Sequence, residues 1–92
     1  MVKPVRHRNN SRIHAFWRAL DRYGVTYSGK VRRDILDQIR NGRSEFISKL
    51  TNTRSVYKVT VGDISLYAVY STSQGEIITF LPEEYIRRNN DI

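Results

Sequence analysis

Alternating apolar and polar positions dominate residues 55–82, SVYKVTVGDISLYAVYSTSQGEIITFLP. Such period-2 alternation is typical of β-strands that bury one face. The Gly62-Asp63 pair between the first two runs suits a two-residue hairpin loop of type II′, which needs glycine at its first position. The pattern therefore predicts three consecutive antiparallel strands, the last of which ends at Pro82 because proline cannot donate to the ladder.

The hairpin loop also predicts which residues of the first two strands lie opposite each other. The pairs expected on the apolar face, which should cover the helices, are Val61 with Ile64, Val59 with Leu66, and Tyr57 with Ala68. The pairs expected on the open face are Thr60 with Ser65, Lys58 with Tyr67, and Val56 with Val69.

The third strand has two possible registers. A loop over residues 71–75 places Tyr70 opposite Glu76, Ala68 opposite Ile78, and Leu66 opposite Phe80. In that register Thr79 lies beside Tyr67 on the open face. A four-residue loop would exchange the two faces of the strand and bury Thr79, because successive side chains of a strand point to opposite sides. We expect the first register.

The region before the strands shows helical periodicity. A first helix is expected to start at Asn10 or Ser11 as N-cap and to stop at Gly24. Within it, apolar residues recur at the i, i+3, i+4, i+7 spacing of one buried face: Ile13, Phe16, Trp17 and Leu20. Four aromatic residues are expected in the core, namely Phe16, Trp17, Tyr57 and Phe80.

A second helix is expected from Lys30 to Asn41, with Ser28 as N-cap and Gly42 as the break. Its inward residues should be Val31, Ile35 and Ile39. The following residues 45–50, EFISKL, alternate only weakly, so a short strand and an irregular lead-in both remain open.

This order predicts an α+β domain in which two N-terminal helices pack on one face of a small antiparallel β-meander of three to four strands. Residues 10–88 should form the single domain. The basic residues 1–9 have almost no apolar content, so they should form a flexible arm, and residues 89–92 should be a frayed tail.

The distribution of charge says more about a partner than the length of the chain does. The chain has 92 residues, no cysteine and a net charge of +7, and eleven Lys or Arg stand against three Asp or Glu in residues 1–43. A lopsided basic field attracts polyanions, which favours RNA or DNA as partner, although a solvated basic surface that only aids solubility is the alternative. No long apolar run is present, so we expect a soluble, cytoplasmic protein that does not bind membranes.

Candidate chemistry centres on the first helix and the open sheet face. His14, Arg18 and Arg22 lie four residues apart and form one stripe. Arg18 would bind a phosphate that His14 serves as general acid or base, although a lone helical histidine is more often a packing or surface residue than a catalyst. The chain has no metal or phosphate-loop motif, so we expect no metal, no cofactor and a metal-free reaction if there is one.

Across the predicted sheet, Lys58, Tyr67 and Thr79 should form a row on three adjacent strands, which ordinary cross-strand pairing also explains. Tyr67 is the best exposed candidate for stacking on a base. Together with Arg12 and Arg22 of the first helix, Tyr67 is expected to hold the substrate.

Four segments resemble a known pattern: HAFWRAL from His14, IRNG ending at Gly42, VYKVTVGDISLYAVYS, and GEIITFLP. They are similar to the small prokaryotic and phage-borne domains of the RNase-toxin superfamily that includes colicin D and RelE. The resemblance implies helices on an antiparallel sheet and metal-free cleavage of transfer RNA or ribosome-bound messenger RNA. Where colicin-type toxins carry basic residues beside the histidine, this chain has Ile13 and Ala15.

The resemblance also assigns roles to residues of this chain. It implies that His14 and Arg18 are catalytic, that Lys58 is the strand cation and that Thr79 is the hydroxyl of the final strand. The resemblance also implies an acidic antitoxin as neutralising partner, and a host protein as partner if the protein acts as an inhibitor or adaptor.

Two functions follow from these observations. The first is a metal-free endoribonuclease that uses the 2′-hydroxyl of RNA as nucleophile. The second is a non-catalytic module that binds nucleic acid or a host protein, as a phage inhibitor or adaptor would. A DNA-binding regulator ranks third, because neither helix shows a base-reading pattern.

Overall fold

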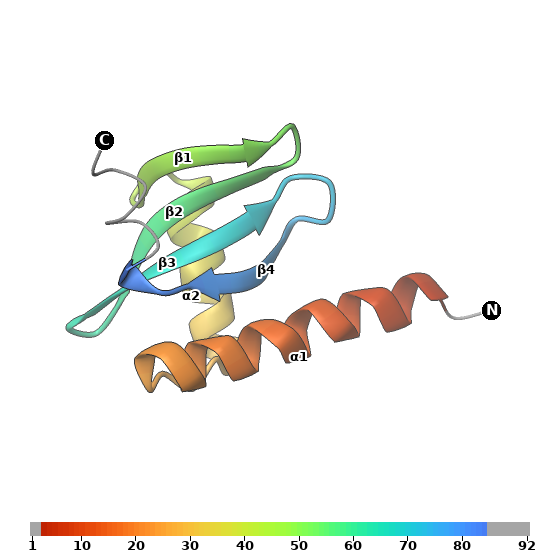
Figure 1. Cartoon of the computed structure of the whole chain (residues 1–92), viewed down its shortest axis with the longest axis horizontal. Helices are drawn as coiled ribbons and strands as arrows, with labels where there is room; N and C mark the ends of the chain where they lie inside the picture. Colours follow the sequence, from red (N-terminus) through yellow and green to blue (C-terminus); the bar gives the residue numbers. More distant parts are fainter. Residues whose placement is uncertain (1–2, 85–92) are drawn as a thin grey trace.

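Two helices and a four-stranded antiparallel sheet make up the described part of the chain (Figure 1). The computed structural model describes the backbone of residues 3–84 and the side chains of residues 11–84. The elements are α1 (Lys3–Tyr23), α2 (Gly29–Arg40), β1 (Glu45–Thr51), β2 (Arg54–Val61), β3 (Ile64–Ser71) and β4 (Glu76–Leu81). The strands lie in the order β1-β2-β3-β4, and the predicted α+β fold is confirmed.

The hairpin of β2 and β3 follows the sequence pattern closely. All six expected pairs are present, from Val61 opposite Ile64 back to Val56 opposite Val69. Gly62 has a φ of 62°, whereas Asp63 has no positive φ, as a type II′ turn requires. The turn and the alternation were therefore sufficient to predict this register.

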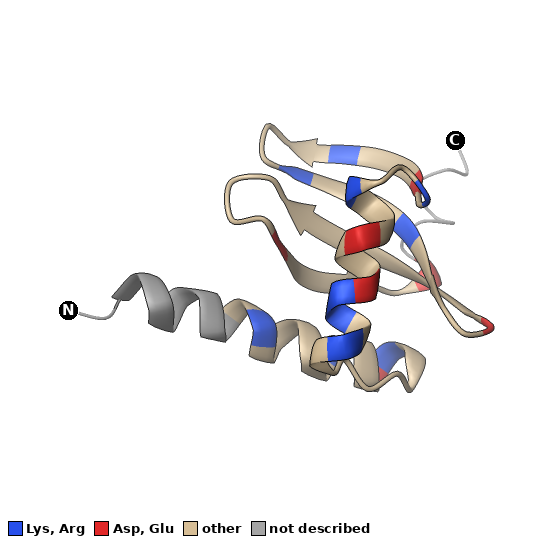
Figure 2. Ribbon diagram, turned by 180° about the vertical axis from the view of Figure 1, so that it is seen from behind, with Lys and Arg blue, Asp and Glu red and all other residues tan. Residues whose placement is uncertain are grey.

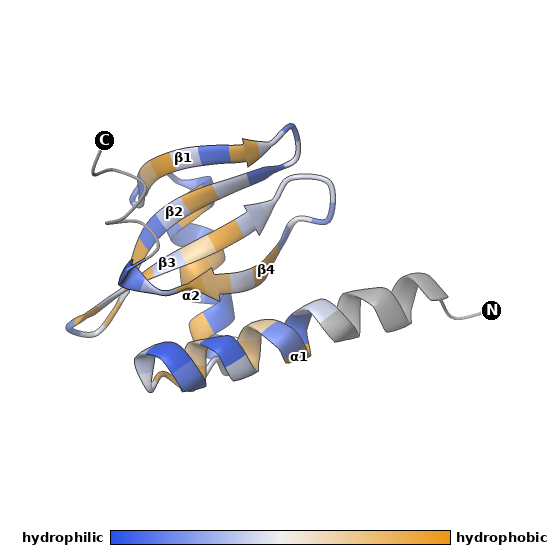
Figure 3. Ribbon diagram, in the orientation of Figure 1, coloured by the Kyte–Doolittle hydropathy of each residue, from blue (hydrophilic) through white to orange (hydrophobic). Residues whose placement is uncertain are grey.

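The core lies between the helices and one face of the sheet. Val59, Leu66, Ala68 and Phe80 of the sheet are fully buried against residues of both helices. Figure 3 shows the alternation of hydrophobic and hydrophilic positions along β2 and β3 that produces this face. On the opposite side, which we call the distal face, Val56 and Val69 form a second apolar cluster to which neither helix contributes.

Helix α2 matches its prediction. Ser28 is the N-cap, and its Oγ accepts a hydrogen bond from the Val31 N–H at 3.2 Å. The buried side chain of Gln38 attaches α2 to β2, because its Nε2 donates to the Thr60 carbonyl at 2.8 Å and its Oε1 accepts from the Thr60 N–H at 3.1 Å. The helix thus lies behind the middle of the sheet, as Figure 1 shows.

The prediction for the buried face of α1 was wrong for three of its four residues, since only Phe16 of the expected stripe packs against the core. Ile13, Trp17 and Leu20 are exposed, whereas Ala15 and Ala19 are fully buried. Helix α1 runs along β4 at the edge of the sheet (Figure 1), and small side chains on its inner face allow the two backbones to approach closely. The i, i+3, i+4, i+7 pattern identified the helix correctly but placed its buried face on the wrong side.

The start of α1 also differs from the prediction. The helix begins at Lys3, well before the expected N-cap at Asn10 or Ser11, so residues 3–9 of the expected flexible arm are helical. The stop at Gly24 is confirmed, since this glycine has a φ of 67° and its N–H donates to the Leu20 carbonyl. The expected tail, residues 89–92, lies outside the described residues.

The register of the last strand was wrong. The loop is Thr72–Gly75, and Tyr70 lies opposite Ile77, not Glu76. A register shift between Val69 and Tyr70 leaves Ile78 as the extra residue of a β-bulge. The four-residue loop by itself would exchange the two faces of β4, but the extra residue of the bulge exchanges them back. Thr79 therefore pairs with Val69 and lies on the distal face.

Residues 45–50, which the sequence left open, belong to strand β1. Its register to β2 shifts twice, and it places Glu45 opposite Lys58 and Phe46 opposite Tyr57. Phe46 is 55% exposed at this edge of the sheet, and its ring contacts Tyr57 with centroids 5.6 Å apart.

Candidate functional site

The predicted row on the distal face is only partly present. Lys58 and Tyr67 are opposite each other as expected, but the residue of β4 beside Tyr67 is Leu81. Thr79 lies one row away, next to Val69. On its other side Lys58 faces Glu45 of β1, so its positive charge has a carboxylate on the neighbouring strand. The structure therefore corrects the row of Lys58, Tyr67 and Thr79.

His14 and Arg18 lie one turn apart on α1. His14 is exposed and Arg18 is half-buried, and no hydrogen bond or ion pair joins either to a side chain in residues 11–84. Two contacts bracket this part of the helix: Arg12 reaches Glu76 and Arg22 reaches the Phe80 carbonyl. The α1 backbone at Arg18 therefore runs alongside the part of β4 that contains Thr79.

The remaining predicted residues already have partners within the fold. Arg22 donates to the Phe80 carbonyl at 2.8 Å and thereby fastens α1 to the edge strand. Tyr67 is half-buried, and its N–H donates to the Tyr23 hydroxyl at 3.4 Å. The Tyr23 hydroxyl in turn donates to the Leu81 carbonyl. Burial raises the pKa of Tyr23, so this hydroxyl keeps its proton near neutral pH.

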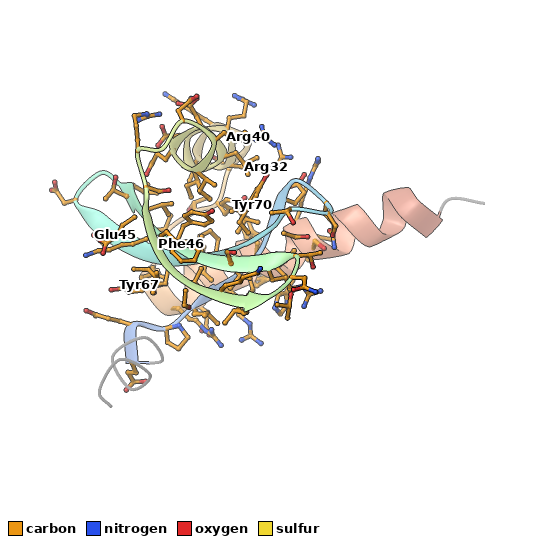
Figure 4. All side chains as sticks on the ribbon, turned by 90° about the horizontal axis from the view of Figure 1, so that it is seen from above. Arg32, Arg40, Glu45, Phe46, Tyr67 and Tyr70 are labelled. Carbon is orange, nitrogen blue, oxygen red and sulfur yellow. The ribbon has the colours of Figure 1, made fainter. Side chains whose placement is uncertain are left out.

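The predicted residues therefore do not converge on one place. Figure 4 shows Tyr67 on the side of the sheet opposite α2, whereas Arg32 lies on the α2 side. Lys58 is on β2, two strands from β4, and neighbouring strands are separated by about 4.8 Å. His14 on α1 and Lys58 on β2 are thus far apart for groups that should act on one phosphate.

A different set of residues does converge, between α1 and the start of α2. A groove of about 600 Å³ opens there, which we call the α1–α2 groove. It is lined by Arg12, Ile13, Phe16, Trp17, Tyr27, Ser28, Gly29, Arg32 and Arg33. Arginines, the exposed Trp17 and a helix N-terminus therefore share one open surface.

A buried ion-pair network borders the groove. Arg12 donates from Nε and Nη2 to Oε2 of Glu76 at 3.3 and 3.1 Å. Arg32 donates from Nε to Oε1 at 3.0 Å and from Nη2 to Oε2. The Glu76 side chain is 5% exposed, against 48% for Arg12 and 23% for Arg32. One carboxylate from β4 therefore holds a guanidinium from each helix.

The charge state of Glu76 follows from this network. Burial alone would raise the pKa of its carboxyl group, but the hydrogen bonds and charges of Arg32 and Arg12 outweigh burial and hold that pKa below its ordinary value. Glu76 is therefore ionised at neutral pH. Each guanidinium has five N–H donors, so several remain for other acceptors.

Tyr27 lies next to this network and has an unusual hydroxyl. Its side chain is 6% exposed, its ring contacts Phe80 edge to face, and its hydroxyl has no hydrogen-bond partner among the described residues. Burial, and after it the negative charge of Glu76, raises the pKa of Tyr27. The hydroxyl is thus a protonated donor without an acceptor among residues 11–84.

Two aromatic rings of α1 line the groove. Trp17, the one tryptophan of the chain, is 59% exposed. The ring of Phe16 supports it edge to face, with centroids 5.4 Å apart and an interplanar angle of 86°. The neighbouring Ile13 is also exposed, so the outer face of α1 presents an apolar, aromatic surface beside the arginines.

The start of α2 concentrates positive charge. Lys30, Arg32 and Arg33 lie among its first five residues, and no acidic residue occupies its first turn. Figure 2 shows these basic positions at the end of α2 that adjoins α1. The helix macrodipole is positive at this end, so it adds to the field of the side chains.

Sequence reasoning assigned only Arg12 of this groove to substrate binding. One available signal was the basic first turn of α2, which contains no acidic residue. The burial of Glu76 had no comparable signal, because it depends on how β4, α1 and α2 meet.

In residues 11–84, no group of three or more His, Asp or Glu side chains is arranged to hold a metal ion. In the same part of the chain, no helix has the length and apolar character needed to cross a membrane.

Comparison of the chain with protein-family models, with curated proteins and with solved structures found no match. The similarity to RNase toxins therefore stays a prediction.

Proposed function

We propose that this protein binds single-stranded RNA in the α1–α2 groove. The observation that carries the proposal is the exposed Trp17 ring beside Arg12, Arg32 and Arg33 in one open groove. Proteins that bind single strands combine aromatic rings, on which unstacked bases lie, with cations that follow the phosphates. A duplex offers no free base face, so this arrangement favours a single strand.

The distribution of charge supports the same partner. Most of the positive excess belongs to residues 1–43, which include both helices that form the groove. Arg33 and Lys30 are exposed there, and Arg12 keeps about half of its side chain in solvent despite its ion pair. A polyanion that approaches this side meets attraction over a wide area, so its affinity should fall steeply with salt.

Trp17 allows a direct test, because its fluorescence reports on the groove alone. Titration with a single-stranded oligoribonucleotide should quench this fluorescence, and a duplex of the same sequence should bind less tightly. Trp17→Ala should weaken binding about tenfold or more, measured by anisotropy of a labelled RNA, since stacking contributes roughly 1–3 kcal/mol per base. Phe46→Ala is the matched control, since Phe46 is similarly exposed but lies on β1.

A second pair of variants separates the groove from general electrostatics. Arg33→Ala should reduce both the affinity and the slope of log affinity against log salt, whereas Arg54→Ala, an exposed arginine of β2, should change them much less. Equal losses for both variants would indicate diffuse attraction and contradict a groove-specific site. Tighter binding to duplex than to single-stranded RNA would also contradict the proposal.

Metal-free endoribonuclease activity is the second candidate function. It is favoured by the course of α1 along β4, which brings the helix segment of Arg18 alongside Thr79. Purified protein with RNA in EDTA should then produce 2′,3′-cyclic phosphate ends, and His14→Ala should abolish cleavage without loss of RNA binding. Intact RNA with the wild-type protein would reject this activity and leave the binding function in place.

A further inference from the structure

The first residues of α2 hold positive charge where a helix normally carries negative charge. Cations at a helix N-terminus oppose the macrodipole and destabilise the helix by a few tenths of a kcal/mol or more each. Here Lys30, Arg32 and Arg33 follow the cap, and within residues 11–84 only Arg32 of these three is ion-paired, with Glu76. The Arg33 guanidinium folds back over the cap, since its Nη1 lies 3.5 Å from the point where a Cβ on Gly29 would stand. An anion bound at this place would relieve the repulsion.

The backbone at the same point offers further donors. The Ser28 side chain accepts from the Val31 N–H, and the Ser28 carbonyl accepts from the Arg32 N–H at 2.8 Å. The N–H groups of Gly29 and Lys30 are at the start of the helix and have no intrahelical acceptor. They lie beside the Arg33 guanidinium, and such a group of donors at a helix N-terminus suits an anion.

Tyr27 supplies an independent indication that something binds here. A buried hydroxyl without a partner costs on the order of 1–3 kcal/mol, so folded proteins rarely retain one. Among the residues that the structure describes, the Tyr27 hydroxyl is such a group, and the residue lines the same groove as Gly29, Arg32 and Arg33. A ligand oxygen that entered the groove would give this donor its missing acceptor.

The charge of the groove indicates which anion fits. Arg12, Arg32 and Arg33 contribute three positive charges, and Glu76 neutralises one of them. A phosphodiester carries one negative charge, whereas a phosphomonoester carries about −1.5 to −2 at neutral pH and offers three acceptor oxygens. The remaining charge of the groove therefore matches a phosphomonoester better than an internal phosphate.

We infer that the start of α2 is a binding site for a phosphomonoester, namely the terminal phosphate of the RNA strand that the groove binds. This inference rests on the proposed function. In the resulting complex, Arg33, the N–H groups of Gly29 and Lys30, and the Tyr27 hydroxyl hold the terminal phosphate. Trp17 lines the same groove, so the base of the terminal nucleotide stacks on its ring.

The test compares one oligoribonucleotide sequence with a 5′-phosphate, with a 3′-phosphate, and with hydroxyl groups at both ends. One of the phosphorylated forms should bind the wild-type protein at least about tenfold more tightly than the hydroxyl form, by Trp17 fluorescence. Inorganic phosphate and a nucleoside monophosphate serve as the free-phosphate arms, and both should compete with that form. In a ¹⁵N-labelled protein, inorganic phosphate should shift the amide signals of Gly29 and Lys30.

Two variants test the location of the phosphate-binding site. Tyr27→Phe and Arg33→Ala should each reduce the preference for the phosphorylated end at least about fivefold. Tyr27→Phe should keep its thermal stability, since it removes only an unpartnered hydroxyl. Tyr57→Phe, a half-buried tyrosine of β2 outside the groove, is the matched control and should keep the preference.

The outcomes separate this inference from the proposed function. Equal affinity of the wild-type protein for all three forms of the oligoribonucleotide would contradict the phosphate-binding site and leave RNA binding in place. An undiminished preference in both Tyr27→Phe and Arg33→Ala would overturn its location. If no oligonucleotide bound but inorganic phosphate still shifted the amide signals of Gly29 and Lys30, RNA binding would be rejected. The binding site for a phosphomonoester would then be supported.

Discussion

Helix α1 has small side chains on its buried inner face and large apolar side chains on its exposed outer face, which is the reverse of the usual pattern. The face toward β4 has the small residues Ala15 and Ala19, which are fully buried. The outer face has the large apolar residues Ile13, Trp17 and Leu20, which are exposed. The helix thus buries two small side chains fully and exposes three large ones, while Phe16 and Tyr23 pack partly against the core.

This difference teaches that the two faces meet different requirements. The inner face must allow α1 to lie close to the backbone of an edge strand, where Arg22 reaches the Phe80 carbonyl. The outer face borders the α1–α2 groove, and exposed aromatic surface next to cations is typical of a binding site. Packing explains the first set of residues, and ligand binding is our proposal for the second.

The largest effect on stability should come from loss of the ion pairs that Glu76 forms with Arg12 of α1 and Arg32 of α2. Glu76→Gln should lower the free energy of unfolding by about 3 kcal/mol, because it leaves two partly buried guanidinium groups without their carboxylate. Urea unfolding measures this change. Asp37→Asn, which removes an exposed ion pair with Arg43, is the control and should cost less than about 1 kcal/mol.

Overpacking the inner face should have the next largest effect. Ala19→Leu should lower the free energy of unfolding by about 2 kcal/mol, because the added atoms must push α1 away from β4. The midpoint of chemical denaturation measures this change. Asp21→Leu on an exposed position of the same helix should change stability by about 0.5 kcal/mol or less. Similar costs for both variants would show that α1 does not lie closely on β4.

Acid should weaken the inner contacts through Glu76. Since the folded-state pKa of Glu76 is below its ordinary value of 4.5, its ionised form stabilises the fold fully above that pH, and this contribution is lost as pH falls through the lower folded-state pKa. The stability difference between wild type and Glu76→Gln should therefore shrink as pH falls below about 4.5. A difference that stayed constant over this range would mean that Glu76 titrates normally.

The outer face should have the smallest effect on stability. Trp17→Ala should change the free energy of unfolding by about 0.5 kcal/mol or less, because more than half of the side chain is already in water. Thermal unfolding of the variant measures this, beside the RNA titration described above. A loss of about 3 kcal/mol, as a buried tryptophan would show, would mean that the outer face is part of the core.

The candidate site could be predicted only in part. Arg12 was correctly found on the first helix, and the row of Lys58 and Tyr67 followed from the hairpin register. Thr79 was misplaced because the bulge at Ile78 has no local signal in the sequence. Trp17 was assigned to the core, since a periodic apolar stripe normally marks the buried face of a helix.

What the sequence determined by itself is local: the two helices with their glycine stops, the Gly62-Asp63 turn, and the pairing of β2 with β3. Turn chemistry and the alternation of adjacent segments decide these features, and both can be read within a few residues. Only the tertiary structure decided which face of α1 is buried, the register of β4, and the meeting of Arg12, Arg32 and Glu76. These depend on how closely segments far apart in the chain can approach, which hydrophobicity alone does not encode.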